Sequence, residues 1–78
     1  MLGCTVTLLE STKLPLPWDL YQASIQVRCG NITSRIFQLT YKDGTELRRK
    51  LEVEVTKFKY IIFLYPQEEL RRRGIIVS

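Results

Sequence analysis

The clearest alternation of apolar and polar residues runs through residues 21–29. Every second residue there is apolar, and those between them are polar or charged; the apolar positions are Tyr21, Ala23, Ile25, Val27 and Cys29. A period of two predicts a strand with one buried and one exposed face. A shorter alternation over residues 4–8 predicts a second strand, and Gly30-Asn31 indicates a turn after the longer one.

Residues 42–44, Lys-Asp-Gly, predict a hairpin turn. A three-residue loop places Leu39 opposite Leu47, whereas a two-residue loop places Leu39 opposite Arg48. We prefer the three-residue loop because it separates apolar from polar side chains. That loop requires Gly44 to adopt the left-handed conformation that follows a type I turn.

Residues 45–52 are also compatible with a helix, since they include good helix formers. Apolar residues recur there and beyond at spacings of three and four, namely Leu47, Leu51, Val55, Phe58 and Ile62. The β-branched residues at 53, 55 and 56 favour a strand, so we expect 45–52 to complete the hairpin. Residues 57–65 are expected to form a further strand, and the apolar run 61–64 predicts cover on both of its faces.

Residues 66–74 have the signals of a short helix. Pro66 suits the first helical position, acidic residues follow in the first turn, and Gly74 stands at the stop position. The sequence therefore predicts one α+β domain over residues 1–78: an antiparallel sheet of four to five strands, open or curled into a barrel, with one short C-terminal helix. The expected core consists of Ile25, Val27, Leu39, Leu51, Val53, Ile62 and Leu64.

Several chemistries are excluded by composition. The chain contains no histidine, which removes the commonest general base and zinc ligand, and its four glycines are scattered singly. Glu52 and Glu54 alternate with basic residues and are interpreted as solvated ion pairs. We therefore expect no enzymatic activity, metal, cofactor or small-molecule substrate. Cys4 and Cys29 could form a disulfide, but we interpret them as reduced, packed thiols.

Positive charge is concentrated in the later part of the chain. The sequence has 12 Lys and Arg against 8 Asp and Glu, and residues 28–78 hold eleven of these basic residues and six of the acidic ones. Such an excess attracts polyanions. The first functional hypothesis is a small basic binding protein that contacts nucleic acid through a sheet face and a helix end, at Arg48, Lys50, Lys59, Arg71, Arg72 and Arg73.

The alternative hypothesis is a protein interaction module, such as an accessory subunit or inhibitor. It would dock or self-associate through the Pro-rich segment, an open sheet edge or the apolar tail; the residues concerned are Pro15, Pro17, Trp18, Ile75 and Ile76. For the Pro-rich segment itself we prefer the interpretation that it ends in Trp18 closing over one end of the core, with docking as the alternative. With no secretory signal and an apolar run of only six residues at 60–65, we expect a soluble cytoplasmic protein without a membrane partner.

Overall fold

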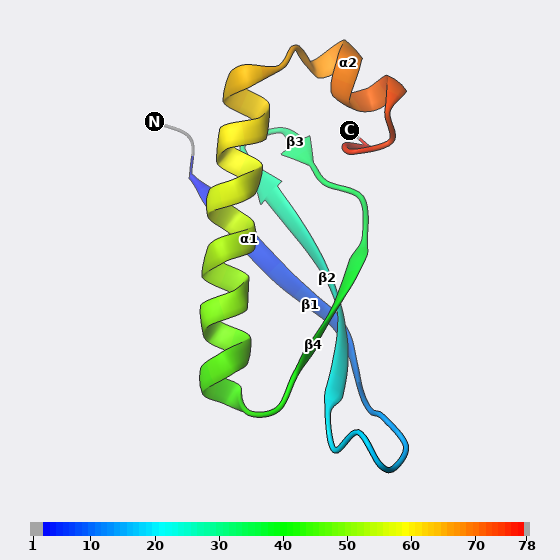
Figure 1. Ribbon diagram of the computed structural model, residues 1–78. Helices are drawn as coiled ribbons and strands as arrows, with labels where there is room; N and C mark the ends of the chain where they lie inside the picture. The colour runs from blue at the N-terminus through cyan, green and yellow to red at the C-terminus, as the bar shows by residue number, and fades with distance from the viewer. Residues whose placement is uncertain (1–2, 78) are drawn as a thin grey trace.

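The structure, a computed structural model, describes residues 3–77 (Figure 1). Within them the chain forms strands β1 (Cys4–Lys13), β2 (Tyr21–Cys29), β3 (Ile32–Thr33) and β4 (Phe37–Tyr41), followed by helices α1 (Gly44–Leu64) and α2 (Gln67–Arg72). The strands make one antiparallel sheet in which β2 lies between β1 and the β3 and β4 strands. The predicted α+β class is confirmed, and the sheet is open rather than closed into a barrel.

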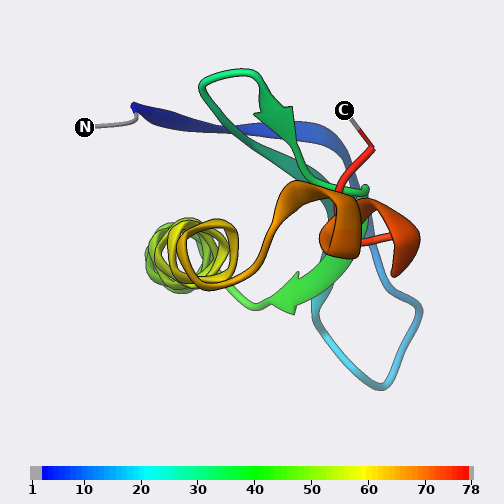
Figure 2. The ribbon, with the colours of Figure 1, turned by 90° about the horizontal axis from the view of Figure 1, so that it is seen from above.

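Strand β2 is the centre of the fold. As its alternation predicted, one face is fully buried, at Ala23, Ile25, Val27 and Cys29. Figure 2 shows α1 packed along this side of the sheet. The opposite face carries amides and hydroxyls, and Gln22 donates a hydrogen bond to Gln38 of β4 at 2.7 Å. One helix layer on one sheet face therefore builds the core.

The predicted hairpin over residues 42–52 and the predicted strand over 57–65 are wrong. Residues 44–64 form the single helix α1, and the glycines with positive φ in the described chain are Gly30 and Gly74, not Gly44. The β-branched residues in α1 cost it only about 0.3–0.7 kcal/mol each relative to alanine. Packing of the apolar residues that recur every three or four positions along α1 outweighs that cost, because burying one large side chain contributes about 1.5–3 kcal/mol.

Asp43 begins this helix instead of turning a hairpin. Its backbone is extended, and its carboxylate accepts a hydrogen bond from the backbone N–H of Glu46 at 2.9 Å. A side chain in this position satisfies one of the four N–H groups that an α-helix leaves without a partner. The Asp-Gly pair that resembles a hairpin turn is thus an N-cap followed by the first helical residue.

Replacing Asp43 by alanine should lower the free energy of unfolding by about 1 kcal/mol, because the cap hydrogen bond is lost. Asp43→Asn, which keeps an acceptor oxygen at the same position, should lose much less. Urea unfolding followed by circular dichroism at 222 nm measures both. Equal stability of Asp43→Ala and the parent protein would contradict the capping role.

The core differs in part from the expected one. Ile25 and Val27 are fully buried and Leu39, Leu51 and Ile62 are half-buried, but Val53 and Leu64 are exposed. Those two positions were assigned to the core on the strand period, and the helical period turns them toward solvent. The side chains that complete the core are Phe58, Leu70 and Ile76.

The short C-terminal helix forms where the sequence predicted it, except that Pro66 is its N-cap and Gln67 is the first helical residue. Gly74 follows α2 with φ +73°, and Glu69 forms ion pairs with Arg72 and Arg73. The apolar tail finds its cover within the chain, since Ile76 is 2% exposed and bridges to Ser34. Assigning Ile75 and Ile76 to a docking surface is therefore wrong, because Ile76 is core and Ile75 is half-buried against it.

Cys4 and Cys29 are joined by a disulfide, so the interpretation as reduced thiols is wrong. The register of β1 against β2 sets the two residues directly opposite each other. Their sequence separation of 25 residues gives no hint of this pairing, which only the strand register creates.

Candidate functional site

The basic residues singled out from the sequence do not share one face. Arg48 and Lys50 lie two residues apart on α1, about 200° around the helix axis, rather than side by side on a strand. Lys50 is occupied: its ammonium donates a hydrogen bond to the Thr40 carbonyl and lies 3.4 Å from a carboxylate oxygen of Glu46. Lys50 would therefore have to give up these contacts to reach a phosphate.

The remaining basic residues lie in two places. Lys59 lies eleven residues, close to three turns, after Arg48 and so on the same side of α1. Arg71–Arg73 lie at α2, where Arg72 and Arg73 are paired with Glu69. Charge alone suggested one basic surface, whereas the fold divides these residues. The nucleic-acid interface stays a prediction.

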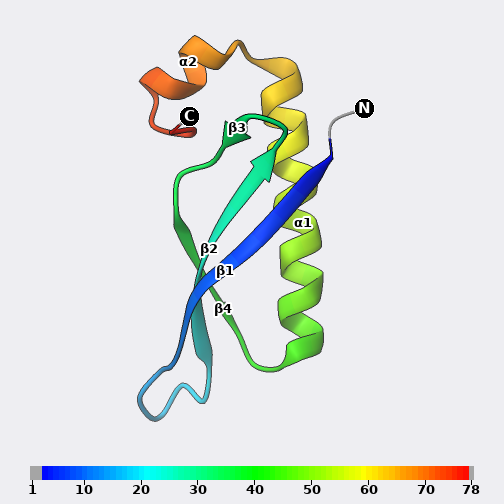
Figure 3. The ribbon, with the colours of Figure 1, turned by 180° about the vertical axis from the view of Figure 1, so that it is seen from behind.

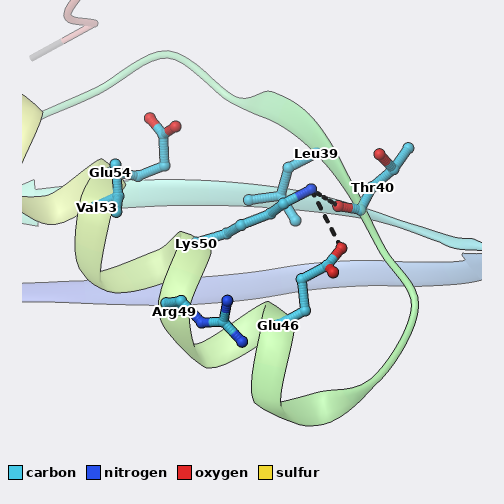
Figure 4. A pocket seen from close by; sticks show the side chains of 7 residues that line it. All are labelled: Leu39, Thr40, Glu46, Arg49, Lys50, Val53 and Glu54. Carbon is cyan, nitrogen blue, oxygen red and sulfur yellow. Dashed lines mark hydrogen bonds and ion pairs between the residues drawn. The ribbon is translucent and has the colours of Figure 1, made fainter.

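The β4 edge of the sheet is partly closed. A groove of about 610 Å³ lies between β4 and α1 (Figure 4), lined by Leu39, Thr40, Glu46, Arg49, Lys50, Val53 and Glu54. Lys50 crosses it to reach the Thr40 carbonyl and Glu46. An edge carbonyl that already accepts a lysine hydrogen bond offers less to an incoming strand.

The β1 edge is open. Cys4 and Cys29 have Cα atoms 4.1 Å apart, the close spacing of a pair that exchanges no backbone hydrogen bonds. The Gly30 N–H donates to the Gly3 carbonyl at 3.2 Å. The residues of β1 whose backbone groups bond to β2 are therefore the odd-numbered ones, up to residue 7. The N–H and C=O groups of Cys4, Val6 and Leu8 consequently point away from β2. No other strand of the described chain pairs with β1.

Beside this edge lies a second groove, of about 530 Å³, which we call the β1–α1 groove. Its lining consists of Val6, Gly44, Leu47, Arg48, Leu51, Glu52, Val55 and Thr56. Its lining residues come from Val6 of β1 and from the first turns of α1, and Figure 3 shows α1 running across the sheet beside β1. Val6, Leu47, Leu51 and Val55 give the groove an apolar floor. Arg48 stands at its polar rim and has no carboxylate within ion-pair distance in residues 3–77.

The Pro-rich segment is a loop between β1 and β2, far from α2 (Figure 1). Pro15 and Pro17 are exposed, and Trp18 is 63% exposed, so the interpretation that Trp18 closes over the core is wrong. The sequence did not identify the β1–α1 groove. Residues 4–8 carry no charge and no proline, which suits a strand that can accept a partner. The sequence does not show that this strand lies at the edge of the sheet, because that depends on β1 having β2 as its one neighbour.

No metal or cofactor site is evident in the described chain. In residues 3–77 no three His, Cys, Asp or Glu side chains gather as metal ligands would. Neither helix there combines the length and apolar character needed to cross a membrane. Comparison with known proteins gave no matching family, no similar curated protein and no similar solved structure.

Proposed function

We propose that the chain is a small interaction module that binds an extended segment of another protein along β1. The observation that carries this proposal is the row of outward-directed backbone groups at Cys4, Val6 and Leu8 beside the apolar β1–α1 groove. An added strand would form main-chain hydrogen bonds to β1 and place every second side chain over the groove. Backbone pairing supplies affinity and the groove supplies selectivity.

The position of α1 favours a single extended segment over a whole sheet. Helix α1 lies across one face of the sheet, in contact with β4, β2 and β1, and so covers the face where a partner's own covering layer would lie (Figures 1 and 3). A domain that brings its own helix to this face would collide with α1. A lone segment would instead occupy the groove and cover the half-buried Leu47 and Leu51.

The lining also favours a particular ligand chemistry. Side chains that point toward α1 would be apolar, because Val6, Leu47 and Leu51 lie beneath them. An acidic residue near the rim would meet Arg48. Backbone recognition with one apolar anchor depends little on salt, in contrast to binding of nucleic acid, which weakens steeply as salt rises. The cytoplasmic location expected from the sequence also stays a proposal. The Cys4–Cys29 disulfide does not favour it, because stable disulfides are rare in the cytosol except in hyperthermophiles.

Leu8→Pro should weaken binding of a segment by about tenfold or more. Proline removes the outward N–H of residue 8 and places its ring on the edge, while the β1–β2 hydrogen bonds are kept. Gln38→Pro is the matched control. The odd-numbered residues of β4 bond to β2, so the N–H of Gln38 points outward from the β4 edge as that of Leu8 does from the β1 edge. Segments selected from a displayed random peptide library are titrated against all three proteins by amide chemical-shift mapping.

The expected result is shifts at Val6, Leu8, Leu47 and Leu51 with the parent protein and Gln38→Pro, and loss of affinity with Leu8→Pro. Equal affinity for all three proteins would overturn the proposal. Failure to select any segment, together with a salt-sensitive shift by a mixed oligonucleotide, would favour the nucleic-acid hypothesis instead.

A further inference from the structure

Residues 60–65, at the C-terminal end of α1, are apolar on all sides of the helix. Ile61 and Ile62 pack against the core, while the side chains on the outer side are solvent-exposed. The exposed fractions are 65% for Tyr60, 85% for Phe63, 63% for Leu64 and 53% for Tyr65. We call these four residues the α1-end patch. A helix that is apolar all round is normally covered on every side, so this patch calls for an external cover.

The patch lies at one end of a long molecule. The principal extents are 42 × 24 × 17 Å, and Figure 1 shows the C-terminal end of α1 together with α2 at one end and the β1–β2 loop at the other. The patch therefore lies at the tip of an elongated molecule, where a flat lipid surface can receive a few side chains.

Charge at this end complements an anionic surface. Residues 57–73 contain five basic and two acidic residues. Lys59 and Arg71 form no ion pair within residues 3–77. Tyrosine rings are suited to the boundary between acyl chains and headgroups, with phenylalanine and leucine below them and lysine or arginine beside the phosphates. The α1-end patch supplies the tyrosines and the apolar side chains, and Lys59 and Arg71 supply the basic ones.

We propose that the α1-end patch docks this protein on the surface of an anionic lipid bilayer. Phe63 and Leu64 enter the acyl boundary, Tyr60 and Tyr65 lie at headgroup level, and Lys59 and Arg71 attract the lipid phosphates. The helix rests on the membrane and does not span it, in agreement with its composition. The patch is separate from the β1–α1 groove, which lies along the N-terminal half of α1, so this inference does not depend on the proposed function.

Vesicle co-sedimentation tests the inference, with phosphatidylcholine vesicles prepared with and without phosphatidylserine. The test variant is Phe63→Glu/Leu64→Glu, and the control is Leu16→Glu/Trp18→Glu. The control adds the same charge at the other end of the molecule, to side chains of matching exposure, 82% for Leu16 and 63% for Trp18. All four side chains are largely solvated, so both variants should fold, which circular dichroism checks.

We expect the parent protein to bind vesicles containing phosphatidylserine and to be released as salt rises. Phe63→Glu/Leu64→Glu should reduce the bound fraction by about tenfold or more, and the control should bind much as the parent does. Absence of vesicle binding at low salt would overturn the inference, as would equal loss in both variants. A patch variant that keeps vesicle binding but loses self-association in sedimentation would identify a protein interface instead.

Discussion

Reduction of the Cys4–Cys29 disulfide should lower the free energy of unfolding by about 3–4 kcal/mol. The bond closes a loop with a sequence separation of 25 residues, and opening a loop of that length restores conformational entropy of this size to the unfolded chain. A chain of 78 residues has a total stability of roughly 4–12 kcal/mol. Loss of the disulfide therefore removes a large part of it, and β1, which the bond ties to β2, should separate first.

Urea unfolding with and without dithiothreitol measures this effect. The control is Cys4→Ala/Cys29→Ala, whose unfolding midpoint should be lower than that of the oxidised parent and indifferent to reductant. Native protein should also resist alkylation until it is reduced. Two freely alkylated thiols in the folded protein, with a midpoint that reductant does not change, would show that the disulfide does not form.

Truncation of Phe58 to alanine should cost about 3–5 kcal/mol. Phe58 is 5% exposed and belongs to the core cluster with Val27, Leu70 and Ile76, so it joins α1 to the sheet and to the C-terminal segment. The substitution loses the transfer free energy of the ring and leaves a cavity where three parts of the chain meet. Chemical unfolding should show a lower midpoint.

Phe63→Ala is the matched comparison, since it removes the same side chain from the same helix. Phe63 is 85% exposed, so its loss should change the free energy of unfolding by no more than about 0.5 kcal/mol. The ratio of the two effects tests the orientation of α1. Similar costs for the two substitutions, or a larger cost for Phe63→Ala, would contradict this orientation of α1.

Where local and tertiary forces agreed, the sequence was sufficient. The alternation over residues 21–29 predicted β2 and its buried face, because strict alternation of apolar and polar residues over nine positions fits a strand and does not fit a helix. The signals around residues 66–74 predicted α2, since acidic residues in its first turn and Gly74 after its end satisfy local requirements of a short helix, although Pro66 is the N-cap and not the first helical residue. The α+β class followed from these elements.

The failure at α1 came from residues that suit two structures. The Asp43-Gly44 pair is compatible with a hairpin turn and with the start of a helix. Leu47, Leu51 and Val55 likewise fit both the alternation of a strand and the spacing of a helix. Preference for the strand depended on small β-branched propensities. The choice was made by packing, because only a helix lays its apolar stripe across the buried face of β2.

The candidate sites depended even more on tertiary structure. The sequence by itself determined the charge, the absence of histidine, the central strand and the terminal helix, all of which are properties of single segments. The open edge of β1, the β1–α1 groove and the division of the basic residues appear only when strands have neighbours and a helix has a direction. The disulfide and the cover over Ile76 likewise join residues distant in sequence. Secondary-structure preferences contribute tenths of a kcal/mol per residue, whereas burial of an apolar side chain contributes several times more. The arrangement that buries the most apolar surface is therefore the one that forms, and it decides which surfaces stay exposed for binding.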